Sequence, residues 1–388
     1  MKEGWEYKKL GDVAIIINGF AFKSSLFTKE GEKILRISNI QNDIVDLSDV
    51  VFFNKETYKQ NLDKYKVYPD DILIALSGAT TGKIGINKTN ETLYLNQRVA
   101  ICRESVKTLN HKYLYCFLKT KSLEFLKDAE GVAQPNLSTE QMKNYVLPIP
   151  PLSEQQHIIE ELDLLSSIIE KKKAQLIELD NLAQSLFYEM FGDPITNEKE
   201  WKVKNLGELV KIINGFAFKS SLFTNKGEKI LRISNIQNGI ITLDDMVFFN
   251  KNTYRQNLDK YKVFPNDIAI ALSGATTGKI GINKTAYEFY LNQRVAICRE
   301  KSKLITRSYL LYFLKTKSME FLRDAEGVAQ PNLSTEQMKR YIVPLPPIDL
   351  QQQFASKIEA IEHQKELIQK SIKEVETLFN SRMDYYFN

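Results

Sequence analysis

The sequence predicts an α/β protein made of two homologous globular domains in tandem, each followed by a long helix. Two observations predict this fold class. Nearly the whole chain repeats after a shift of 196 residues, so that LNQRVAICRE at 95–104 stands again at 291–300. Each copy closes on a proline cluster, at 148–151 and 344–347, and apolar residues with heptad spacing follow each cluster.

The repeat continues as far as Pro347 without insertion or deletion. The segments NGFAFKSSLFT, LRISNIQN, SGATTGKIGINKT and DAEGVAQPNLSTEQMK each occur twice. A repeat of this length is too long for a solenoid unit, so each copy is a whole domain. We therefore expect a first domain at 1–150, a first helical spacer at 151–192, a second domain at 193–346 and a second spacer at 347–388.

Each domain shows strand signals first and helix signals later. Runs rich in β-branched and other apolar residues at 13–17, 33–37 and 71–76 each end at a turn signal. Helical spacing of apolar residues predicts a helix over 111–127. Ser138 and Gln141 have capping-box spacing and predict the start of another helix. Both kinds of element are present, so the domain is α/β and not all-β.

A long helix follows each proline cluster, because the apolar positions there alternate between steps of three and four residues. Only Lys172 and Lys365 interrupt the two series. Helices of about 35 to 40 residues would be roughly 50 to 60 Å long. They should pack on each other, either as an ordinary two-helix stalk or as an antiparallel pair that relates the halves by an approximate two-fold axis and sets their separation. The apolar positions are Ile158, Leu162, Leu165, Ile169, Leu176, Leu179, Ala183, Leu186 and Met190, then Phe354, Ile358, Ile361, Ile368, Ile372, Val375 and Phe379.

The composition is ordinary for a soluble globular protein, which we place in the cytoplasm. Of the 388 residues 43% are hydrophobic and 26% are charged, and no apolar run approaches the roughly 18 residues of a membrane span. The net charge of +5 is compatible with a nucleic-acid partner but does not establish one. Cys102, Cys116 and Cys298 lack C-x-x-C spacing and are interpreted as buried thiols. The three histidines share no ligand spacing, so we predict no metal site.

No segment of the sequence matches one of the following catalytic motifs in full. The segment 78–83 resembles a P-loop, but three residues instead of four separate its glycines and Ile84 follows its lysine, which excludes nucleotide hydrolysis. It is either a polar loop for phosphates or base edges, or a glycine turn between strands. Asp70 and Asp71 lack a nuclease partner, and Asn266 replaces Asp70 in the second copy, so we expect solvated turn carboxylates. Nucleophile elbow, amino-methyltransferase and dinucleotide-binding motifs are missing too, which leaves a binding protein.

Polar and basic residues in the repeated loops are the candidate binding residues. Arginine can grip guanine, and asparagine or glutamine can grip adenine, so these residue types suit major-groove recognition of DNA. The alternative for each is a turn residue bonded to its own backbone, and for Arg36 and Arg98 a structural ion pair. The candidates are Lys23, Arg36, Asn39, Gln41, Ser77, Thr80, Thr81, Lys83, Gln97, Arg98, Gln134 and Asn136, with their repeats Lys219, Arg232, Asn235, Gln237, Ser273, Thr276, Thr277, Lys279, Gln293, Arg294, Gln330 and Asn332.

Over essentially its full length the chain resembles the specificity subunits of type I restriction-modification enzymes. The likeness lies in GVAQPNL at 131–137 leading to PIPPLSEQQ at 148–156, and in the repeated opening Trp-x-x-x-x-Leu-Gly at Trp5 and Trp201. The second spacer departs from the pattern, because Asp349-Leu350-Gln351-Gln352 lacks the glutamate of the first. That departure affects local capping only, since the heptads continue.

The resemblance implies two target recognition domains that alternate with two antiparallel helical spacers. It further implies a subunit without catalysis or cofactor of its own, which binds a bipartite site in double-stranded DNA. Its partners would be two methyltransferase subunits, which methylate adenine with S-adenosylmethionine, and translocating endonuclease subunits.

Two near-identical domains related by a two-fold axis should recognise one short sequence on opposite strands, which predicts an interrupted palindrome with the helices setting the gap. A fragment ending near Asn197 should also pair with a second copy of itself. Two rival classes remain. The recognition half of a fused restriction and modification enzyme should carry methyltransferase motifs, and none are present. A protein-interaction adaptor or carbohydrate-binding module would show no affinity for DNA.

Overall fold

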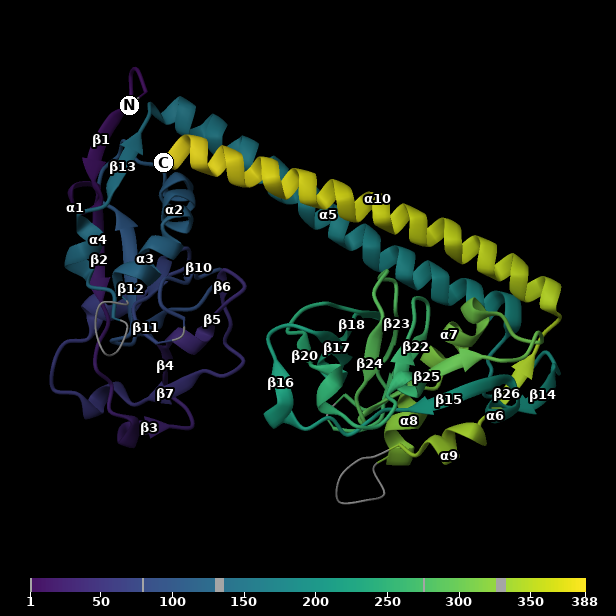
Figure 1. Cartoon of the computed structure of the whole chain (residues 1–388). Helices are drawn as coiled ribbons and strands as arrows, with labels where there is room; N and C mark the ends of the chain where they lie inside the picture. Colours follow the sequence, from purple (N-terminus) through teal and green to yellow (C-terminus); the bar gives the residue numbers. More distant parts are fainter. Residues whose placement is uncertain (1, 79, 130–135, 275, 326–332) are drawn as a thin grey trace. The chain divides into compact units, whose positions relative to one another are not determined.

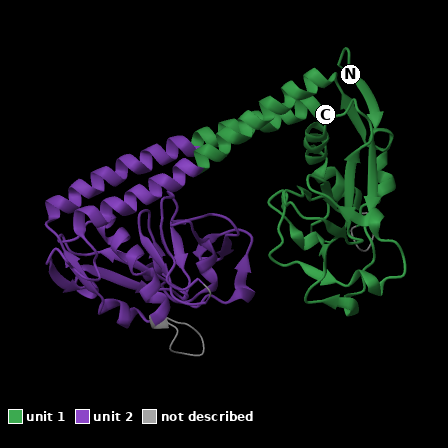
Figure 2. Ribbon diagram, turned by 180° about the vertical axis from the view of Figure 1, so that it is seen from behind, with its two compact units in different colours: residues 1–173, 370–388 green, residues 174–369 purple. Residues whose placement is uncertain are grey.

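The chain forms two compact units in a computed structural model, and each unit is described separately (Figures 1 and 2). Unit 1 contains residues 1–173 and 370–388, and unit 2 contains residues 174–369. Each unit thus combines one repeated domain with a segment of each of two long helices. The structure describes residues 2–78, 80–129, 136–274, 276–325 and 333–388.

Two sheets form the centre of unit 1, and a two-stranded ribbon joins the ends of its domain. The first sheet has the order β2 (Ala14–Asn18), β12 (Val99–Glu104), β9 (Ile72–Ala75), β10 (Ile84–Ile86), β6 (Ile44–Val45), β5 (Ile40–Gln41). The second has the order β3 (Phe27–Thr28), β7 (Val51–Phe53), β4 (Glu32–Leu35), β11 (Leu93–Leu95), β8 (Lys66–Val67). The ribbon pairs β1 (Glu6–Lys9) with β13 (Val146–Ile149). Neighbours are antiparallel except for the pairs β6–β10 and β4–β11.

Strand β9 shows how the core is built, because all four of its residues are buried. Successive side chains of a strand point to opposite faces. Ile72 and Ile74 therefore join a cluster that includes helix residues such as Phe117. Leu73 and Ala75 join a second cluster, which includes residues of β4 and β11 in the other sheet. The apolar run predicted at 71–76 is confirmed as a strand with both faces covered.

The helices of the domain lie where the sequence predicts helices, but their number differs from the prediction. Gln141 and Ser138 form the predicted capping box, with the Ser138 N–H donating to Gln141 Oε1 at 3.0 Å. The single helix predicted over 111–127 is wrong, because the chain turns at Lys121. Ser122 donates its hydroxyl to the Gly82 carbonyl at 2.7 Å, a distant contact that ends one helix and starts the next. The helices are α1 (Leu10–Val13), α2 (His111–Thr120), α3 (Ser122–Ala129) and α4 (Thr139–Lys143).

Unit 2 repeats the elements of unit 1 in the same sheet orders. Its strands are β14 (Lys202–Asn205), β15 (Val210–Asn214), β16 (Phe223–Thr224), β17 (Glu228–Leu231), β18 (Ile236–Gln237), β19 (Ile240–Ile241), β20 (Val247–Phe249), β21 (Lys262–Val263), β22 (Ile268–Ala271), β23 (Ile280–Ile282), β24 (Phe289–Leu291), β25 (Val295–Glu300) and β26 (Ile342–Leu345). Its short helices are α6 (Leu206–Leu209), α7 (Arg307–Thr316), α8 (Ser318–Ala325) and α9 (Thr335–Lys339).

The two long helices are α5 (Leu152–Phe191) and α10 (Ile348–Phe387), each of 40 residues. In unit 1 Glu161 of α5 accepts a hydrogen bond from Arg382 Nε at 2.6 Å, and Lys173 pairs with Glu376 at 3.1 Å. As the residue numbers increase along α5, the numbers of their partners on α10 decrease. The two helices are therefore antiparallel, as predicted. Lys365, which interrupts the apolar series of the second spacer, pairs in unit 2 with Asp180 at 2.6 Å.

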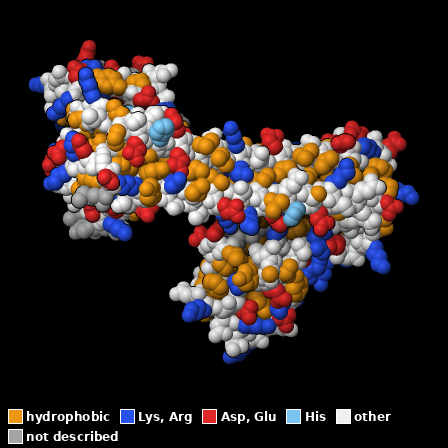
Figure 3. Space-filling model, turned by 90° about the horizontal axis from the view of Figure 1, so that it is seen from above, with side chains coloured by type: hydrophobic (Ala, Val, Ile, Leu, Met, Phe, Trp, Pro, Cys, Tyr) orange, Lys and Arg blue, Asp and Glu red, His pale blue; other side chains and the backbone are white. Residues whose placement is uncertain are grey.

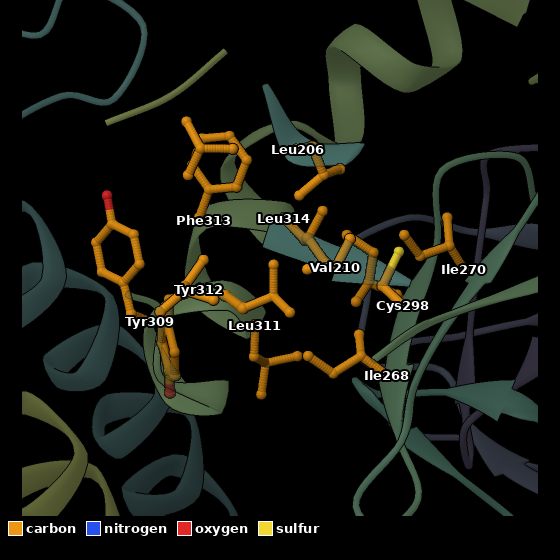
Figure 4. Close-up of a cluster of buried hydrophobic side chains, with 14 of the residues drawn as sticks. Leu206, Val210, Ile268, Ile270, Cys298, Tyr309, Leu311, Tyr312, Phe313 and Leu314 are labelled. Atoms are coloured by element: carbon orange, nitrogen blue, oxygen red, sulfur yellow. The ribbon is translucent and has the colours of Figure 1, made fainter. Parts of the chain in front are cut away.

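Both long helices contribute to the core of each unit. In unit 1 the ring of Phe387, at the end of α10, lies 5.0 Å from that of Tyr113 on α2. In unit 2 the ring of Phe191, at the end of α5, lies 4.8 Å from that of Tyr309, the repeat of Tyr113. Figure 4 shows Tyr309 within the core of unit 2, where α7 packs against the strands. The ends of the helices are therefore structural parts of the recognition domains.

No helix in the described part of the chain is long and apolar enough to cross a membrane.

Candidate nucleic-acid interface

Backbone hydrogen bonds bring the repeated polar loops together. The Phe20 N–H donates to the Leu95 carbonyl, and the Gln97 N–H donates to the Phe20 carbonyl, both at 2.8 Å. Gly19 permits this approach, because a Cβ at that position would lie 2.0 Å from the Asn96 carbonyl oxygen. In unit 2 a Cβ at Gly215 would likewise lie 2.0 Å from the Asn292 carbonyl oxygen. Loops 18–23 and 95–98 are thus one surface in each unit.

The loop after β9 joins this surface. The Leu76 N–H donates to the Arg98 carbonyl at 2.9 Å, and the Leu137 N–H donates to the Leu76 carbonyl at 2.7 Å. The end of β4 is adjacent too, since the Asn96 N–H donates to the Leu35 carbonyl at 3.0 Å. Segments separated by up to 119 positions in the sequence, from Asn18 to Leu137, therefore lie side by side.

Three of the predicted contact residues use their polar atoms inside their own loops. Asn39 is buried, accepts from the Arg36 N–H at 2.9 Å and donates to the Asp46 carbonyl at 3.0 Å. Thr81 is buried and donates to the Gly78 carbonyl at 2.7 Å. Gln41 is exposed but donates to the Ser38 carbonyl at 3.1 Å. Corresponding bonds occur at Asn235, Thr277 and Gln237.

Arg36 is half-buried and held by its neighbours. Its Nη2 donates to the Asp49 carbonyl at 2.9 Å and to the Asp49 carboxylate at 3.2 Å. Its repeat, Arg232, donates to the Asp245 carbonyl. These bonds match the ion-pair alternative for this position.

Four other predicted residues are exposed in loops, and their side chains form no hydrogen bond with any residue that the structure describes. No carboxylate of the described chain lies within ion-pair distance of these cations, although the same chain forms many surface ion pairs elsewhere. Cations and amides that are not engaged by other residues can bind the phosphate groups of a nucleic acid. These residues are Lys23, Lys83, Gln97 and Arg98, with Lys219, Lys279, Gln293 and Arg294 in unit 2.

Hydroxyl groups next to these cations are unpaired. Among the residues that the structure describes, the buried hydroxyls of Ser77 and Thr80 have no hydrogen-bond partner, and neither does that of Thr276, the repeat of Thr80. Ser77 forms an isolated β-bridge with Asn136, which is exposed. Ser273 is half-buried at the equivalent place. The predicted residues Gln134, Gln330 and Asn332 lie outside the described residues.

The expectation of solvated carboxylates is wrong for Asp71. That side chain is 5% exposed and accepts two hydrogen bonds from the guanidinium of Arg103, which raise the pKa of Arg103. The repeat Asp267 binds Arg299 in the same way, at 2.7 Å from Nε. Only Asp70 is exposed, where it pairs with Lys88 at 2.8 Å. A bidentate pair satisfies a carboxylate that could not otherwise be buried.

Groups suited to metal binding or covalent catalysis do not gather here. Among the residues that the structure describes, no three His, Cys, Asp or Glu side chains could hold a metal ion. Cys102 and Cys298 are buried as predicted, and Cys116 is half-buried. Burial raises the pKa of the Cys102 thiol to about 12, which keeps it protonated and unreactive at neutral pH.

Sequence reasoning missed residues of the loop 54–64, which lies across from Lys23. Phe20, Lys23, Tyr58 and Lys59 line one hollow in the structure. A usable signal was present in the repeat, since Lys59 becomes Arg255 and its charge is kept.

A family model described as the type I restriction modification DNA specificity domain matches the chain twice, at residues 2–179 and 198–377. The chain belongs to this family. It is therefore a DNA specificity subunit with two target recognition domains, a recognition component and not a catalytic one, and the fold class inferred from sequence is confirmed.

Specificity subunits of known enzymes align with nearly the full chain. The subunit of EcoBI from Escherichia coli is 25% identical over 95% of this chain and 82% of its own length. The subunit of MjaVIII from Methanocaldococcus jannaschii is 26% identical over 96% of this chain and 90% of its own. A solved structure concerned with assembly and conformational transition of the type I system has the same fold, with a TM-score of 0.62 at 16% identity, covering 100% of this chain and 98% of that chain.

Proposed function

We propose that this specificity subunit recognises a bipartite site in double-stranded DNA, with one half-site bound by each unit, and acts in the cytoplasm. One observation carries the proposal: exposed amides, and exposed cations that pair with no carboxylate of the described residues, stand in the same loops of both units. Lys83 and Arg98, with their repeats Lys279 and Arg294, supply the charge. The buried Asn39 and Thr81 instead hold the loops in shape.

The two half-sites should have the same sequence in opposite orientation. Each unit receives the end of a long helix through the same contact, Phe387 on Tyr113 in unit 1 and Phe191 on Tyr309 in unit 2. Antiparallel helices that exchange equivalent contacts are the signature of an isologous two-fold relation. Such a relation supports an interrupted palindrome, with the paired helices setting the gap between its halves.

The paired helices also suit the role of a platform for methyltransferase and endonuclease subunits. Exposed apolar side chains are interspersed with charged ones on the face shown in Figure 3. Exposed leucines of the two helices include Leu182 and its repeat Leu378, each 47% exposed, and also Leu164 and Leu367. The repeated position supports one methyltransferase subunit for each half of the chain.

Methylome sequencing tests the proposal. A host that expresses this chain with its cognate methyltransferase subunit should gain one new methyladenine motif, with two mirrored half-sites and a fixed gap. A host with the methyltransferase subunit alone is the control. A motif with unrelated half-sites would contradict the palindrome. If both proteins are present and associated but no motif appears, the adaptor alternative replaces DNA recognition.

Arg98 and Arg294 should each govern one half-site, because both are exposed and free to reach a base. Arg98→Ala is expected to weaken binding by about 1 to 3 kcal/mol and to relax one position in one half-site. Arg294→Ala should relax the mirrored position in the other. The readout is the methylation motif of each variant, with Arg36→Ala as a comparison whose side chain is held by Asp49. Uniform weakening without a change of motif would assign Arg98 to phosphate contact.

A further inference from the structure

A hollow of about 390 Å³ lies beside the predicted contact loops of unit 1. It is formed between the 3-10 helix η1 (Ser24–Leu26) and the loop that follows η3 (Lys55–Thr57). Its lining includes the apolar side chains of Phe20 and Leu26 and the polar ones of Lys23, Lys59 and Gln60. It is an open depression with both apolar and cationic residues in its lining.

Local packing fixes the shape of this hollow. The rings of Phe20 and Tyr58 meet edge to face with centroids 5.5 Å apart, and the Lys23 N–H donates to the Tyr58 hydroxyl at 3.3 Å. Unit 2 has the same arrangement. The rings of Phe216 and Tyr254 are 5.5 Å apart, and the Lys219 N–H donates to the Tyr254 hydroxyl at 3.2 Å. Two loops are therefore clamped in one geometry in both units.

The two copies differ at several exposed positions outside the hollow. Glu6 corresponds to Lys202 and Glu30 to Lys226, so two exposed positions reverse their charge between the halves. Around the hollow every lining residue is identical in the second copy except Lys59, which becomes Arg255. The same lining in both copies means that the hollow can serve the same role in both units.

The cations of this hollow are available to a ligand. Within the described ranges, no carboxylate pairs with Lys23, Lys59, Lys219 or Arg255, and all four residues are exposed. Nearby lysines are already engaged, as Lys55 is with Asp63 at 3.1 Å. The charge that remains free is positive in both copies.

We propose that this hollow binds the DNA backbone beside each half-site, with Lys59 and Arg255 contacting phosphates and the apolar part of the lining lying against deoxyribose. This inference rests on the proposed function. The exchange of lysine for arginine favours phosphate over base contact. The two side chains differ in shape and in the number of their donors, which matters at a bidentate site, whereas both neutralise a phosphate. Two units that recognise the same half-site can therefore differ at this position without a change of specificity.

The test uses the full chain assembled with its methyltransferase subunit. Affinity is measured between 50 and 200 mM salt for a duplex that carries the motif found by methylome sequencing, and for an equally long duplex without it. The slope of log affinity against log salt is negative. Lys59→Ala combined with Arg255→Ala should make it less steep by about 2. Each substitution should weaken both duplexes roughly tenfold at 0.1 M salt and leave the methylation motif unchanged.

Two sets of variants serve as controls. Lys59→Arg combined with Arg255→Lys keeps both charges and should keep the slope. Lys107→Ala combined with Lys303→Ala removes exposed, unpaired lysines from a loop whose neighbouring residues differ between the copies, and should also keep the slope.

The outcomes separate this inference from the proposed function. An unchanged slope in the double alanine variant, while the unsubstituted complex still binds its motif, overturns the phosphate contact alone. A relaxed position in the motif would overturn it as well, because Lys59 would then contact a base. If the unsubstituted complex binds neither duplex and methylates no motif, the proposed function itself fails.

Discussion

A fragment that ends at Asn197 should form a dimer in which two copies of α5 pair antiparallel. In the whole chain the core of unit 1 is completed by the end of α10, where Phe387 packs on Tyr113 and Met383 lies against the same cluster. The fragment lacks α10, but Phe191 and Phe187 of a second copy stand at the equivalent helix positions. Each copy can therefore supply the missing helix end of the other.

Analytical ultracentrifugation at tens of micromolar measures this association, and the expected species is the dimer. The same fragment with Phe191→Ala is the control and should shift toward monomer, because it loses the ring that replaces Phe387. Glu161 loses its partner Arg382 in such a dimer, since Leu186 stands at that position of α5, so the association should be weaker than the intramolecular pairing. A fragment that stays monomeric would contradict the expectation that a second copy of α5 can replace α10.

Phe187→Ala should cause the largest loss of stability of any single substitution discussed. Phe187 is fully buried, and its ring lies 5.2 Å from Phe191, 5.5 Å from Tyr309 and 5.7 Å from Phe354. Removing a buried phenylalanine ring leaves a cavity and typically lowers the free energy of unfolding by about 3 to 5 kcal/mol. The effect should be confined to unit 2, whose core contains this ring.

Hydrogen exchange followed by mass spectrometry measures both the size of this loss and its location. Peptides of unit 2 should lose protection while peptides from β2, β9 and β12 of unit 1 keep theirs. Ile177→Ala on the same helix is the matched control, since Ile177 is 61% exposed, and it should change stability by no more than about 0.5 kcal/mol. Equal effects of the two substitutions would show that the end of α5 is not part of the core.

The outcome at the candidate site illustrates what sequence reasoning can and cannot provide. It identified the repeated polar loops because repetition and turn residues are visible along the chain, and their contact with DNA stays a prediction. It could not separate Asn39, whose amide donates to the Asp46 carbonyl, from Arg98, whose guanidinium binds no described residue, since both are polar residues in repeated loops. It also passed over Lys59, because only the folded chain brings that residue next to Lys23 and Phe20.

The sequence by itself determined the duplication, the strand and helix signals, the capping box at Ser138 and the heptads of both spacers. These are local or periodic properties, which neighbouring residues specify directly. The tertiary structure decided which loops form one surface, that Asp71 is a buried partner of Arg103, and that α2 and α3 are separate helices. It also decided that Phe387 completes the core around Tyr113. Such contacts join residues far apart in the chain, and only the burial of apolar surface on folding selects them.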